Sequence, residues 1–133
     1  MIRDASYVAH RARHQRYHLR LQRVMKTLSP HVREMLDNVA IVFAEEPTRE
    51  QLRESGLGPD DELFGLYHGI PRTERSSSYS MVLPDHISIF IGPLERAYAS
   101  RRALEEQIRI TVLHELGHHL GLDEDGLEAM GLS

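Results

Sequence analysis

The spacing of hydrophobic residues divides the chain into helical and extended segments. In the C-terminal third, Leu113, Leu116 and Leu120 recur every three or four positions, so they would share one face of an α-helix. Residues 39–43 form a continuous apolar run rich in β-branched side chains, and apolar residues alternate along 84–91. Both patterns are typical of β-strands.

Prolines and capping residues place the boundaries of these segments. Ser29 followed by Pro30 favours a helix start, and Pro47, Pro71 and Pro93 mark where strands end. The pattern predicts helices over 17–26, 30–36, 48–54 and 97–120 (the last as one helix or two), strands over 39–43, 63–70 and 84–91, and a short closing helix after Asp123.

The composition is that of one globular domain. The chain has 133 residues, of which 41% are hydrophobic and 27% charged, and it has no cysteine. A disulfide framework and a thiolate metal site are thereby excluded, which fits a reducing compartment. No apolar run approaches the roughly 18 residues of a membrane-spanning helix. We therefore expect a cytoplasmic protein with no membrane partner.

The charge is divided unevenly along the chain. Residues 1–33 carry a net charge of +7 and the other hundred residues carry −11, within a total of −4. Such a basic segment favours a flexible N-terminal arm over 1–16 that lies in solvent or against its own acidic domain. With one aromatic residue in 11–23 and no recognised binding fold, a nucleic-acid partner is not expected.

The candidate chemistry lies in the last predicted long helix, where His114, Glu115 and His118 spell the motif H-E-x-x-H. Successive helical residues turn by about 100°, so the two imidazoles lie about 40° apart on one face, one turn above each other. Two imidazoles in this arrangement can share one metal ion. The opposite face of the helix is hydrophobic, so one flank is suited to burial and the other to a cleft.

The residue types predict a catalytic zinc site. Zinc binds neutral imidazole nitrogen and carboxylate oxygen, and catalytic sites keep three protein ligands with a fourth position open for water. We assign His114, His118 and Asp123 as the ligands. Gly121 can end the helix in a left-handed turn and so direct Asp123 back towards the ion. Glu115 is turned away from coordination and is predicted to be the general base for the metal-activated water.

Long segments of the chain resemble the small bacterial zincin-like metallopeptidases, sometimes described as a minimal matrix-metalloprotease-like domain. The resemblance rests on HELGHHLGLDEDGLEAMG from residue 114, LDNVAIVFAEEPT at 36–48 and LFGLYHGIPRTERSSSYSMVLPDHISIFIGPLER at 63–96. It implies a single zincin-like domain over 1–133 with an α+β fold, in which a small mixed sheet packs on the helix that carries H-E-x-x-H. It also implies one bound zinc ion and zinc-dependent peptidase activity.

The resemblance further implies where a substrate binds. In zincin-like folds, an edge strand beside the active-site helix accepts an extended peptide by main-chain pairing. We expect residues 86–91 to bind a peptide or unfolded protein in this way. Tyr67 and Tyr79 are candidates to hydrogen-bond the oxyanion of the reaction, although packing is the commoner role of a tyrosine.

Two points stay open at the level of the sequence. The larger metzincin pattern has a third histidine where this chain has a carboxylate, so Glu124 and Glu128 are alternatives to Asp123 as third ligand. The function also has alternatives. A metal-dependent endoribonuclease would recruit Glu124, although that family has glycine where Glu115 stands. A catalytically silent binding module would use its zinc only to stabilise the C-terminal turn.

Overall fold

The structure is a computed structural model that describes residues 5–69 and 85–129. Its elements, in chain order, are α1 (Ala5–Thr27), α2 (Pro30–Met35), β1 (Ala40–Ala44), α3 (Arg49–Glu54), β2 (Gly65–His68), β3 (His86–Phe90), α4 (Ile91–Ala97), α5 (Arg101–His119) and α6 (Glu124–Ala129). No helix within these two ranges combines the length and the apolarity that crossing a bilayer requires.

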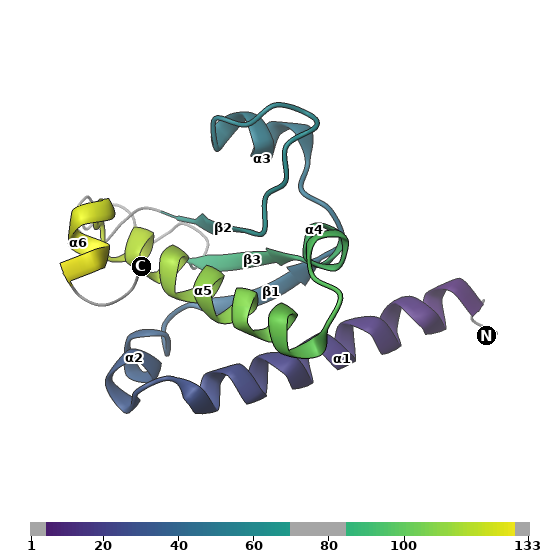
Figure 1. Cartoon of the computed structure of the whole chain (residues 1–133), viewed down its shortest axis with the longest axis horizontal. Coiled ribbons are helices and arrows are strands. Elements are labelled where there is room, and N and C mark those ends of the chain that lie inside the picture. Colours follow the sequence, from purple (N-terminus) through teal and green to yellow (C-terminus); the bar gives the residue numbers. More distant parts are fainter. Residues whose placement is uncertain (1–4, 70–84, 130–133) are drawn as a thin grey trace.

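The strands form a small mixed sheet in the order β1-β3-β2. β1 runs parallel to β3 and places Ile41 beside Ile87, whereas β2 runs antiparallel and places Tyr67 beside the same residue. Helix α5 crosses one face of this sheet, and α1 lies alongside α5 (Figure 1). The predicted α+β fold, with a small mixed sheet on the motif helix, is confirmed.

The core fills the space between the sheet, α5 and α1. Ile87 and Ile89 point from β3 towards α5, and both are completely buried. On α5 the buried positions recur every four residues, at Leu104, Ile108, Val112 and Leu116. Helix α1 adds Tyr17 and Val24 to the same cluster, and Leu28, the residue after the helix, joins them. Burial of a large apolar side chain stabilises a fold by roughly 1.5–3 kcal/mol, so this stripe fixes which side of α5 faces the sheet.

Helix α1 begins much earlier than its apolar pattern indicates. The predicted arm over 1–16 is helical from Ala5 onward. Its charges pair with acidic residues of the domain: Nε of Arg13 lies 3.1 Å from both carboxylate oxygens of Glu45, and Nη1 of Arg13 lies 2.6 Å from Glu95. These contacts join residues far apart in the chain, so the hydrophobic pattern could not reveal them.

The position of β3 corrects one premise of the sequence analysis. The strand at 86–91 was expected to be an edge, but β3 is the central strand, hydrogen-bonded to β1 on one side and to β2 on the other. Its main-chain groups are therefore engaged in the sheet, and a peptide could not pair along it. Within the described residues, the outer strand that faces α5 and its motif is β2.

Candidate active site

Helix α5 presents the motif because its two ends are capped. At its start, the hydroxyl of Ser100 accepts a hydrogen bond from the Ala103 N–H at 3.1 Å. At its end, Gly121 has a φ of 74°, a left-handed conformation that glycine adopts without strain. The Leu122 N–H then donates to the Gly117 carbonyl at 2.9 Å, which closes a Schellman turn. The predicted turn at Gly121 is thus confirmed.

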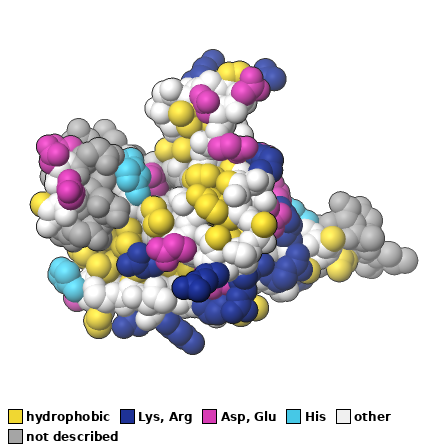
Figure 2. All heavy atoms as spheres, viewed as in Figure 1, with side chains coloured by type: hydrophobic (Ala, Val, Ile, Leu, Met, Phe, Trp, Pro, Cys, Tyr) yellow, Lys and Arg dark blue, Asp and Glu magenta, His cyan; other side chains and the backbone are white. Residues whose placement is uncertain are grey.

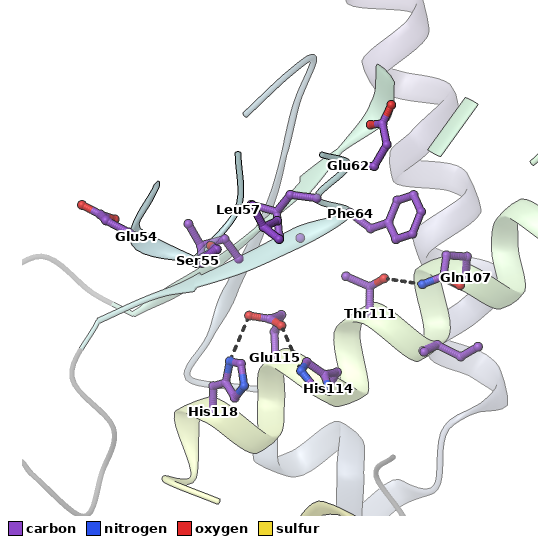
Figure 3. A pocket seen from close by; sticks show the side chains of 14 residues that line it. Glu54, Ser55, Leu57, Glu62, Phe64, Gln107, Thr111, His114, Glu115 and His118 are labelled. Carbon is purple, nitrogen blue, oxygen red and sulfur yellow. Dashed lines mark hydrogen bonds and ion pairs between the residues drawn. The ribbon is translucent and has the colours of Figure 1, made fainter. Parts of the chain in front are cut away.

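The two histidines of the motif lie side by side on the open flank of α5. The ring centroids of His114 and His118 are 4.8 Å apart, with the planes inclined by 68°. Their side chains are 36% and 43% exposed, in contrast to the buried leucine flank. Figure 3 shows both rings directed towards the carboxylate of Glu115 from the same helix. The helical spacing thus brings the two imidazoles together.

Glu115 is held between the two rings and against β2. Its side chain is only 7% exposed, and Oε1 accepts a hydrogen bond from the backbone N–H of Tyr67 at 2.7 Å. Oε1 also lies 3.2 Å from Nδ1 of His118, and Oε2 lies 3.9 Å from Nε2 of His114. Ligand atoms of all three side chains lie within 4.8 Å of one another. Strand β2 and helix α5 therefore fix this carboxylate jointly.

A glycine lets β2 approach α5 so closely. A Cβ atom at Gly65 would overlap the Thr111 methyl group and would lie 3.0 Å from the carbonyl oxygen of Ser88. Because Gly65 has no side chain, β2 can lie directly over Thr111 and Glu115. This close approach brings the Tyr67 N–H within hydrogen-bonding distance of Glu115.

Asp123 occupies a different place from the three motif residues. It is exposed, and its Oδ1 accepts a hydrogen bond from the Gly126 N–H at 2.8 Å, so it caps the start of α6. The group of mutually close ligand atoms on α5 comprises His114, Glu115 and His118, without Asp123. Glu128 is exposed on α6, and the side chain of Glu124 lies outside the described part of the chain. The assignment of Asp123 as a ligand stays a prediction.

A pocket of about 500 Å³ opens between α5, β2 and the segment that leads into β2. The three motif residues and Thr111 line its α5 side (Figure 3). Ile110 lies on the same helix, and the other walls combine apolar side chains, such as those of Leu57 and Phe64, with the polar ones of Glu54, Ser55 and Glu62. In Figure 2, hydrophobic side chains gather on the face between α3 and α5. The size is ordinary for a ligand site, and the three motif residues lie together on one wall.

A buried polar network adjoins the site and was not predicted. The carboxylate of Asp85 accepts a hydrogen bond from the Tyr67 hydroxyl at 2.8 Å, and its Oδ2 lies 2.8 Å from Nδ1 of His119. Asp85 and His119 are 7% and 4% exposed. On the helical wheel His119 falls on the same side as Glu115 and Leu116, which was a signal of burial. The Tyr67 hydroxyl is thus engaged with Asp85, while Tyr79 lies outside the described residues.

The donor set fits a zinc ion. Two imidazoles lie one helical turn apart beside a carboxylate, in a chain without cysteine. A motif helix of this kind beneath a small mixed sheet defines the zincin class of metal-dependent hydrolases. The family model of zincin-like metallopeptidases matches residues 36–132, and the chain belongs to this family. No curated protein matches the chain.

Family membership sets the broad chemistry. It supports a zinc site and a hydrolase of the metallopeptidase type, without identifying a substrate or a catalytic residue. The matched residues 36–132 include β1, all of α5 and the motif. Helices α1 and α2 precede the matched range.

Proposed function

We propose that this protein is a zinc-dependent peptidase in which His114 and His118 bind the metal ion and Glu115 is the general base. The observation that carries this proposal is the position of Glu115. Its carboxylate is buried, held by a β2 backbone N–H, and placed between the two imidazoles at one end of an open pocket. A candidate general base must lie within reach of the proton that it takes, and this geometry supports such a role.

Side-chain and backbone groups of the protein position the general base. The bound zinc ion would supply Lewis-acid activation of the substrate carbonyl and of the attacking water. The Tyr67 N–H holds Oε1 of Glu115, which leaves Oε2, 3.9 Å from Nε2 of His114, to accept the proton of the water. The same carboxyl group then delivers that proton to the leaving amine.

For the third ligand we propose Glu124 in place of Asp123. In the metzincin pattern H-E-x-x-H-x-x-G-x-x-H, the third ligand stands ten residues after the first histidine, and Glu124 occupies that position here. Asp123 stands one residue earlier, and its carboxylate caps α6. Glu124 is the first residue of α6, directly after the turn that ends α5.

For the substrate we propose an extended peptide paired along β2. This strand lines the pocket through Gly65 and Leu66, and it is the outer strand on the α5 side within the described residues. Main-chain pairing with β2 would place a scissile bond over Glu115. The apolar side chains in the pocket, such as those of Leu57, Phe64 and Leu66, favour peptides with a hydrophobic side chain beside that bond.

The substitution Glu115→Gln tests the role of the base. The amide keeps the size of the side chain but cannot accept the proton, so we expect zinc content to be retained while casein hydrolysis falls by about 10²–10⁴-fold. Glu106→Gln makes the same change at an exposed position of α5 away from the pocket and should hydrolyse casein like the wild type.

Three results would contradict this proposal. If zinc-loaded Glu115→Gln cleaves casein as fast as the wild type, Glu115 is not the base. If the wild type cleaves structured RNA and not casein, the endoribonuclease alternative holds. If zinc stabilises the chain but neither polymer is cleaved, the protein is a silent zinc-stabilised module.

A further inference from the structure

A second group of metal-binding side chains lies on α1, away from the H-E-x-x-H motif. His10 and His14 are one helical turn apart, with ring centroids 4.3 Å from each other. Glu45, the residue after β1, faces them: its Oε1 lies 3.6 Å from Nδ1 of His10 and 3.4 Å from Nε2 of His14. Ligand atoms of the three residues all lie within 4.8 Å of one another.

The carboxylate of Glu45 is held in place from two directions. The backbone carbonyl of Glu45 accepts a hydrogen bond from the Gly92 N–H at 2.8 Å, and this bond fixes the residue at the junction of β1 and α4. Its side chain is contacted by Nε of Arg13, while the same guanidinium pairs with Glu95. The two carboxylates outweigh the single charge of Arg13, so this trio retains a net negative charge beside the imidazoles.

The distances suit a metal ion better than a hydrogen bond. Two ligand atoms that each lie about 2.0–2.1 Å from a tetrahedral zinc ion are about 3.3 Å apart. The 3.4 and 3.6 Å separations from Glu45 Oε1 are close to this value. Nε2 of His14 is shielded from solvent and has no hydrogen-bond partner among the described residues, although Glu45 is near. Buried polar atoms normally have a partner, and a bound metal ion would provide one for this nitrogen.

We propose that His10, His14 and Glu45 form a second site for a divalent transition-metal ion. Two imidazoles and one carboxylate select zinc and its neighbours, such as cobalt and nickel, over magnesium or calcium. The bound ion joins the N-terminal half of α1 to the end of β1 and so stabilises the helix that extends from the domain (Figure 1). This site is independent of the proposed peptidase function, and both histidines precede the residues matched by the family.

Zinc binding to the tag-free full chain tests this proposal. Equilibrium dialysis should give one fewer zinc ion per chain for His10→Ala/His14→Ala than for the wild type. In the background His114→Ala/His118→Ala, which lacks the motif histidines, zinc should still bind and should raise the melting temperature. Adding Glu45→Gln to that background should weaken zinc binding by at least about tenfold, since even outer partners of metal ligands cost 10–100-fold.

The controls make the result decisive. His31→Ala removes an exposed histidine from α2 and should leave both stoichiometry and affinity unchanged. Glu45→Gln keeps the size of the side chain, so it tests the ligand set even if the double alanine variant loses the N-terminal turns of α1. The proposal is overturned if His10→Ala/His14→Ala binds as many zinc ions as the wild type. It is equally overturned if Glu45→Gln binds zinc as tightly as its parent.

Discussion

At the scale of single residues, the site depends on polar side chains that satisfy one another away from water. Tyr67 contributes twice, because its N–H donates to Glu115 and its hydroxyl donates to Asp85. Asp85 also accepts from the buried ring of His119 at the last residue of α5. Glu115 is therefore linked through Tyr67 to a network that ties the start of β3 to the end of α5.

Removing Asp85, the centre of this network, should lower the free energy of unfolding. Asp85→Ala deprives the Tyr67 hydroxyl and the His119 ring of this acceptor, and an unsatisfied buried polar group costs about 1–3 kcal/mol. We expect a loss of at least this size in the free energy of unfolding, measured by urea denaturation. Asp37→Ala, at an exposed turn position, should change it by less than about 0.5 kcal/mol. Equal stabilities of the two variants would show that the network contributes nothing.

At the scale of elements, the close contact between β2 and α5 holds the side chain of Glu115 in place. Gly65 faces Thr111, one turn before Glu115, and this contact leaves no room for a methyl group. On the other face of the same strand, His68 stacks on His86 of β3, with centroids 4.3 Å apart and planes inclined by 11°. One face of β2 thus packs on the motif helix, and the other carries a histidine pair.

Gly65→Ala tests the first of these contacts. The added Cβ would overlap Thr111, so β2 must move away from α5, and overpacking of this kind costs typically about 1–3 kcal/mol. Urea denaturation should show this loss. Combination with Thr111→Ser, which removes the opposing methyl group, should restore part of it. Gly58→Ala is the control, because its Cβ would meet Asp61 only at an ordinary 3.5 Å. If both glycine variants are equally stable, the close approach is not required.

The histidine pair predicts a dependence of stability on pH. Burial, and then the charge of His86, lowers the pKa of His68 below its ordinary value. The unfolded chain therefore binds this proton more readily, so the free energy of unfolding falls as the pH drops below about 6.5, the ordinary histidine pKa. His68→Gln should give a shallower fall between about pH 7 and 5 in urea denaturation. An unchanged slope would mean that His68 does not titrate differently on folding.

Local pattern predicted most elements but not α4. The sequence pattern assigns Pro93 as a stop signal, yet this residue lies in the first turn of α4, which begins at Ile91. Proline is tolerated there because the first-turn N–H groups have no partner within the helix. Helix α5 starts at Arg101, after the Ser100 cap, within the segment 97–120 that the pattern predicts to be helical. The spacing of hydrophobic residues therefore located the elements. Whether a proline ends a helix depends on its position, because the first turn of a helix accepts it.

At the scale of the whole molecule, basic residues of α1 form ion pairs with acidic residues of the rest of the domain. Arg13 pairs with Glu45 and Glu95, and Arg23 pairs with Glu105 at 2.9 Å. Figure 2 shows Lys and Arg side chains gathered along the lower edge of the molecule, over α1 and the start of α5. The basic N-terminal segment thus lies against acidic partners of its own chain.

The paired histidines of the motif follow from local spacing, so the sequence predicts them directly, whereas the α+β fold class rests on the resemblance of long segments to the zincin-like family. His114 and His118 share a face of α5 wherever that helix packs. The order of the strands follows from pairing between distant segments, so the central place of β3 was not visible in its alternating pattern. Likewise, the partnership of Asp85 with His119 joins residues 34 positions apart. Neither has a signal in residue spacing.

The central claim is that His114 and His118 bind one zinc ion beside an uncoordinated Glu115. Anomalous diffraction at the zinc edge, from crystals of the zinc-loaded full chain, tests it most directly. We predict an ion about 2.0–2.1 Å from a nitrogen of each ring, with Glu124 as third ligand and Glu115 outside the coordination sphere. An ion bound directly by Glu115, or no ion between the two rings, would contradict the account.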